Sequence, residues 1–67
     1  MIDWFRILTE LDRAGINNSE VARRLGHHPS TIHRWKMNEN EPPYSDGIRL
    51  IEIHSYVTSS FALMQTK

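Results

Sequence analysis

Residues 17–35 read NNSEVARRLGHHPSTIHRW, and this stretch decides the fold because it holds the start and stop signals of two short helices. Asn17 is a helix-capping residue, and the side chain of Glu20 can reach back to its N–H, as in a capping box. The first helix continues through VARRL and ends at Gly26, where the turn needs a positive φ. The second helix opens at Pro29, because proline favours the first helical position. The stretch therefore predicts two helices joined by a tight turn.

The second of these helices is polar over most of its surface. Ile32 and Trp35 lie three positions apart, so they share one face and can anchor the helix to a core. A helix held by only two apolar residues leaves a wide polar face open. The polar positions are Ser30, Thr31, His33, Arg34 and Lys36.

A further helix is predicted upstream, from about Asp3 to Arg13. The acid at its start suits the positive end of the helix dipole, and Gly15 is the expected stop. Its apolar residues recur with the 3.6-residue period of a half-buried helix. The predicted inner face consists of Phe5, Leu8 and Leu11, with Trp4 and Ile7 alongside.

The chain after this stretch predicts a loop and one more helix. Residues 37–47, MNENEPPYSDG, are rich in asparagine, proline and glycine, which break any helical period. A helix is expected from about Ser45 to Val57 or Thr58. Its predicted inner face consists of Leu50, Ile51, Ile53 and Val57. The sequence thus predicts an all-α domain of four to five helices over residues 1–58.

Residues 59–67 are predicted to be a C-terminal tail. It is too apolar for a purely disordered end, so it either packs back on the core or meets a second subunit, for instance as a short strand. The candidates for a dimer contact are Phe61, Leu63 and Met64.

Length and composition restrict the class of protein. Sixty-seven residues make one small domain whose stability is marginal unless oligomerisation adds to it. The absence of cysteine excludes disulfides and Cys-based zinc sites and is compatible with a reducing compartment. No apolar run approaches the length of about 20 residues that a membrane span needs.

The charge is distributed unevenly although the formal net charge is zero. No carboxylate occurs between Val21 and Asn38, so this segment can present a positive face to a phosphate backbone. The alternative is a solvated charge cluster without a partner. The cations of the segment are Arg23, Arg24, Arg34 and Lys36, beside three histidines.

The segments NNSEVARRLG and HHPSTIHRW resemble the helix-turn-helix family of phage Cro and lambda-type repressors, and the resemblance extends over about Phe5 to Val57. It implies a lambda-repressor-like fold and a sequence-specific transcriptional regulator of double-stranded DNA, with residues 29–37 as the recognition helix. The small size and the apolar tail favour a homodimer, which is expected in the cytoplasm of a bacterial host on a near-palindromic operator with half-sites about 34 Å apart. No cofactor, metal, membrane or small-molecule ligand is expected, and no enzymatic activity.

The family also implies which positions meet DNA. Pro29 stands where a glutamine is common in the family; it can touch a thymine methyl but cannot read a base edge by hydrogen bonding. The guanidinium of Arg34 can donate two bonds to guanine, worth about 1–3 kcal/mol of discrimination, or it can contact a phosphate. Arg23 is expected to face solvent. The predicted base contacts are His28, Pro29, Ser30, His33 and Arg34, and the predicted phosphate contacts are Asn18, Arg24, Thr31, Lys36, Asn38 and Asn40.

Other chemistries fit these residues less well. A serine three positions before a histidine on one helix, Ser30 and His33, lacks a third member and an oxyanion hole. The aromatic residues Trp4, Phe5 and Trp35 lie at core spacings rather than at base-stacking positions. Zinc ligation would need the histidines to converge, whereas His54 is expected to be a partly buried core residue. The histidines considered are His27, His28, His33 and His54.

The main rival is a protein-interaction module. Helix-turn-helix folds also serve as antitoxins or polymerase-binding adaptors, and the neutral net charge suits such a role. The apolar tail would then be the contact surface. Salt separates the two hypotheses, because only DNA binding releases counterions from a duplex.

Overall fold

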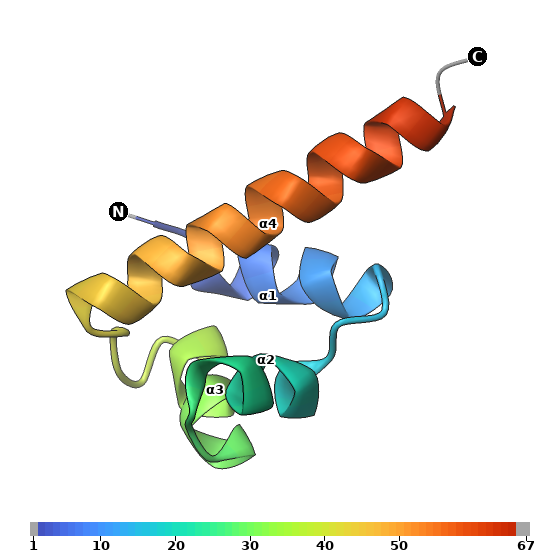
Figure 1. The fold of residues 1–67 in the computed structure, drawn as a ribbon. Helices are drawn as coiled ribbons and strands as arrows, with labels where there is room; N and C mark the ends of the chain where they lie inside the picture. The colour runs from blue at the N-terminus through green and yellow to red at the C-terminus, as the bar shows by residue number, and fades with distance from the viewer. Residues whose placement is uncertain (1, 66–67) are drawn as a thin grey trace.

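The computed structural model describes residues 2–65, and for residues 60–65 it describes the main chain without the side chains. These residues form four α-helices and no strand. The helices are α1 (Trp4–Arg13), α2 (Asn18–Leu25), α3 (Pro29–Lys36) and α4 (Tyr44–Gln65). Helix α1 lies between α4 on one side and the α2–α3 pair on the other (Figure 1). The predicted all-α class is confirmed.

The starts of the first three helices follow the predicted local signals. The carboxylate of Asp3 accepts the N–H of Arg6 at 3.1 Å and caps α1. The side-chain oxygen of Asn17 accepts the N–H of Glu20 at 2.9 Å and caps α2. Pro29 is the first residue of α3. Each cap satisfies a backbone donor that would otherwise have no partner inside its helix.

Each of these helices is followed within two residues by a residue with positive φ, namely Gly15 (96°), Gly26 (78°) and Asn38 (64°). Directly after it, a backbone N–H returns to the carbonyl five positions back, as in the Schellman motif. The two glycines were predicted to act as stops. Asn38 was not, although asparagine tolerates this conformation better than most residues. The returning bonds run from Ile16 to Leu11 at 2.8 Å, from His27 to Ala22 at 2.9 Å and from Glu39 to Arg34 at 2.9 Å.

One apolar core joins all four helices. Its buried members are Trp4, Leu8, Leu11, Val21, Ala22, Leu25, Ile32, Trp35 and Leu50, with Ile7, Ile16, Ile53 and Val57 partly buried against them.

Two residues were wrongly predicted to lie in the core. Phe5 is 49% exposed and Ile51 is 39% exposed. On α1 the inner stripe is Trp4, Leu8 and Leu11, which leaves Phe5 about 100° further round the helix. There the ammonium of Lys36 lies 5.5 Å from the centre of the phenyl ring, so Phe5 forms a cation–π contact at the surface instead of packing in the interior.

Helix α4 is longer than predicted at both ends. It takes in Tyr44 from the predicted loop and continues through residues 59–65, so the strand suggested for the tail is wrong. Extending an existing helix adds one hydrogen bond per residue without a new nucleation cost. The side chains of Phe61, Leu63 and Met64 lie outside the described residues, so the dimer contact predicted there stays a prediction. Among the described helices, none has the length and apolarity needed to cross a bilayer.

Candidate functional site

Five exposed side chains form one surface on α3 and the residue before it. We call this surface the α3 face; it consists of His28, Pro29, Ser30, His33 and Arg34. The helical positions are spaced so that they project on the same side of the helix. On the opposite side, Ile32 is fully buried and Trp35 is 3% exposed. The predicted arrangement of an open polar face above two apolar anchors is therefore what the fold presents.

His28 caps α3, a role that the sequence reasoning missed. Its Nδ1 accepts the backbone N–H of Ser30 at 3.1 Å and lies 2.9 Å from the hydroxyl oxygen of Ser30. Accepting at Nδ1 requires the neutral tautomer with its proton on Nε2, which leaves Nε2 as a donor. Protonation of Nδ1 would remove the cap. His28 therefore fixes the start of α3 and the orientation of Ser30.

The cations near this face differ in their pairing. The carboxylate of Glu20 accepts from the guanidinium of Arg23 and from Nε of Arg24, the latter at 2.9 Å. The predicted hydrogen bond from the N–H of Asn17 to Glu20, which would complete a capping box, is thus wrong. The carboxylate of Glu20 accepts from the two arginines instead. Within the described residues Arg34 has no ion-pair partner and is exposed. Arg34 is the cation of α3 most available to an external ligand.

The pairing of Glu20 predicts a specific acid sensitivity. Hydrogen bonds from Arg23 and then Arg24 lower the pKa of Glu20 from 4.5 to about 2. Because the folded-state pKa lies below the unfolded one, the ion pairs stabilise the fold above pH 4.5, and this contribution is lost as the pH falls toward 2. In the parent protein the urea midpoint should therefore fall as the pH is lowered through this window, and we expect a smaller fall in Glu20→Gln. At neutral pH the substitution should reduce stability only slightly, because the ion pair is exposed.

The control for this measurement is Glu39→Gln, an exposed glutamate that forms no ion pair within the part of the chain described. It should keep the pH profile of the parent protein. Superimposable acid profiles of the parent and the Glu20→Gln protein would contradict the assignment.

A histidine–carboxylate pair ties the α2–α3 turn to α4. Nε2 of His27 lies 2.7 Å from a carboxylate oxygen of Asp46, whose side chain is only 14% exposed. The imidazole also meets the ring of Trp35 edge to face, with the centres 5.3 Å apart. The turn before α3 is thus held from two sides. Sequence reasoning missed this role of Asp46, because nothing local links residues that are 19 positions apart.

The predicted phosphate contacts differ in exposure. Asn18 is the first residue of α2, and its side chain is half-buried. Thr31 and Lys36 are half-buried on the flanks of α3, and Lys36 lies over Phe5. Arg24, Asn38 and Asn40 are exposed.

The histidines do not gather into one site. His54 is partly buried, as predicted, and its Nε2 lies 2.5 Å from a carboxylate oxygen of Glu10 on α1. His27 pairs with Asp46 instead. In the residues that the structure describes, no three histidine, aspartate or glutamate side chains are grouped so that they could hold a metal ion.

No protein-family model, curated protein or solved structure matches this chain.

Proposed function

We propose that this chain binds double-stranded DNA in a sequence-specific manner, as a small transcriptional regulator of the Cro and lambda-repressor kind. The observation that carries the proposal is the α3 face, whose five side chains are exposed directly above the buried Ile32 and Trp35. An α-helix with its side chains is about 10–12 Å across, and the major groove of B-DNA is about 12 Å wide. A helix held in this way can enter the groove without unpacking the core.

The pairing of α2 with α3 supports a helix-turn-helix. Only three residues, Gly26–His28, separate the two helices, and these helices form the most extensive helix–helix contact in the described chain. In this proposal α3 is the recognition helix and α2 crosses the DNA backbone. The N-terminus of α2 at Asn18 offers backbone N–H groups and a positive dipole end, both of which suit a phosphate.

The hydrogen bonds at the start of α3 refine the expected readout. If the hydroxyl of Ser30 donates to His28, its lone pairs face outward and accept from adenine N6 or cytosine N4. Nε2 of His28 donates, so it suits an acceptor such as guanine N7. Pro29 contributes apolar contact to a thymine methyl. Arg34, one turn further along, supplies either a bidentate guanine contact or a phosphate contact.

Two copies of the chain on a near-palindromic operator complete the proposal. A single α3 reads only a few base pairs, whereas a two-fold dimer reads two half-sites about 34 Å apart. The affinity then depends on both copies, so half-site spacing becomes a measurable property of the operator.

A selection of binding sequences from a random duplex library, repeated over a range of salt concentrations, tests the proposal. Each copy has three cations that are predicted to contact DNA, and six per dimer give an expected slope of log K against log salt of about −5. An enriched motif with this salt dependence is the expected result. Failure to enrich any sequence at low salt would overturn the proposal. The three cations are Arg24, Arg34 and Lys36.

A protein-interaction module is the second candidate, because a specific surface favours it. An open apolar depression of about 500 Å³ lies where the N-terminal segment meets the start of α4. Its rim includes Ile2, Tyr44, Ile48 and Ile51, which are 38–85% exposed. Binding through such a surface would depend little on salt, so the same titration separates this function from DNA binding.

A further inference from the structure

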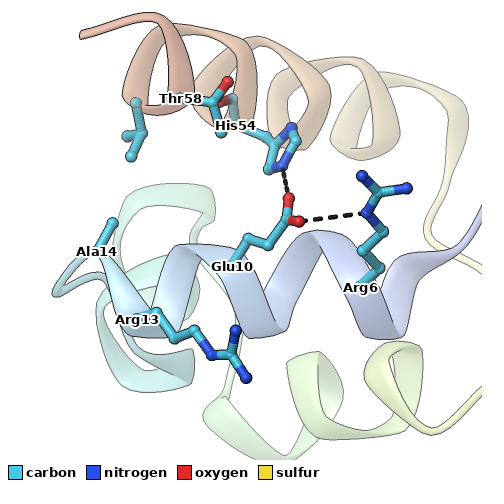
Figure 2. A pocket seen from close by; sticks show the side chains of 7 residues that line it. Arg6, Glu10, Arg13, Ala14, His54 and Thr58 are labelled. Atoms are coloured by element: carbon cyan, nitrogen blue, oxygen red, sulfur yellow. Dashed lines mark hydrogen bonds and ion pairs between the residues drawn. The ribbon is translucent and has the colours of Figure 1, made fainter. Parts of the chain in front are cut away.

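A groove between α1 and α4 lies away from the α3 face. It has a volume of about 530 Å³. Figure 2 shows Glu10, Arg6 and His54 meeting between the two helices, whereas the guanidinium of Arg13 points away from them. The lining residues are Arg6, Glu10, Arg13, Ala14, His54, Val57 and Thr58.

The groove carries more cationic than anionic groups. Its carboxylate, Glu10, accepts from His54 at 2.5 Å and from Nε of Arg6 at 3.2 Å. These bonds, with that from His54 first, lower the pKa of Glu10, so the carboxylate is ionised and already engaged. Arg13 also lines the groove, although its guanidinium points away from Glu10. The open side of the groove therefore favours a partner with an apolar surface and a negative end.

Helix α4 continues well past the point where it packs on the core. Val57 is its last described residue in contact with the core cluster, and Thr58 and Ser59 are exposed. The helix nevertheless extends to Gln65 and projects beyond the other helices (Figure 1). The sequence there, TSSF, has poor helix propensity. Packing from outside would stabilise an extension of this composition.

The end of α4 has the chemistry that the groove favours. Phe61, Leu63 and Met64 make its sequence apolar. The last turn contains no basic residue, so the partial negative charge of its terminal carbonyls is not offset within that turn. Cations of the groove would offset this charge.

We propose that the groove of one copy receives the C-terminal end of α4 from a second copy. The same helix supplies one wall of the groove and, a turn later, the segment that enters the partner. A two-fold arrangement therefore fills both grooves at once and closes into a dimer. This inference gives the homodimer of the proposed function its contact surface, and it can be measured without DNA.

Sedimentation of the full chain without DNA, compared between Thr58→Glu and Ser55→Glu, tests the proposal. Both sites are exposed on α4 and each substitution adds one negative charge, but only Thr58 lines the groove. We expect the parent chain and Ser55→Glu to form dimers, and Thr58→Glu to dimerise at least about tenfold more weakly, because it places a bulky negative charge opposite the negative end of the partner helix. Helicity by circular dichroism checks that both variants fold.

Several outcomes would overturn the proposal. They are a monomeric parent chain at high micromolar concentration, equal losses in the two variants, no loss in Thr58→Glu, and assembly beyond a dimer. The failure of this inference is distinguishable from the failure of the DNA proposal, because Arg34→Ala lies outside the groove and is expected to leave dimerisation intact.

Discussion

Arg34→Ala is expected to weaken binding to the selected operator by about 10- to 100-fold, measured by titration at one fixed salt concentration. Arg34 is exposed on the α3 face and has no ion-pair partner in the described chain, so its guanidinium reaches a ligand without first breaking a contact. A bidentate bond to guanine contributes about 1–3 kcal/mol of discrimination.

Arg23→Ala is the matched control for this measurement. It removes the same charge from an exposed position on α2, but the guanidinium of Arg23 is already bonded to the carboxylate of Glu20. Its loss is therefore expected to change operator affinity by no more than about threefold. Equal losses in the two variants would contradict the placement of the α3 face in the groove.

Arg34→Lys separates the two roles left open for this residue. Lysine keeps the charge but cannot form the planar, two-bond contact with guanine. If Arg34 reads a base, the lysine variant loses discrimination at one position of the operator while keeping the salt slope. If it contacts a phosphate, the lysine variant retains most of the affinity, and the alanine variant lowers the slope by about one.

The boundaries of the first three helices could be predicted because their causes are local. Asp3 and Asn17 bond to an N–H three residues away, and Gly15 and Gly26 adopt the left-handed backbone that ends a helix. Each of these signals acts over a few residues, so the capping side chain and the backbone group that it bonds lie close together in the sequence. The α3 face was predictable for the same reason, since two apolar anchors in a polar helix fix which side is exposed.

The contacts between helices could not be predicted, because they depend on how α4 crosses the others. His54 and Glu10 are 44 positions apart and His27 and Asp46 are 19 apart. Both pairs depend on the crossing of α4 over the other helices, which no local sequence signal shows. The exposure of Ile51 has the same origin: Leu50 occupies the buried position on α4, and adjacent helical residues point about 100° apart.

Ile32→Ala is expected to destabilise the domain by about 2–5 kcal/mol, measured by urea denaturation followed by circular dichroism. Ile32 is fully buried and is one of two apolar anchors that hold α3 in the core, so truncation leaves a cavity where α3 packs. A chain of this size has little stability to lose, so a substantial unfolded fraction is expected at ambient temperature.

Ile32→Val keeps the β-branched shape and removes one methylene, so an expected loss of about 0.5–1.5 kcal/mol leaves the protein folded. Comparing the valine and alanine variants also tests the proposed function, because Ile32 contributes to DNA binding only by holding α3 in position. The valine variant should therefore bind the operator as the parent does, and the alanine variant should lose affinity only in proportion to its unfolded fraction. A folded Ile32→Ala protein with parental stability would contradict the role of this anchor. A folded Ile32→Val protein that fails to bind would show that Ile32 acts on DNA through more than the position of its helix.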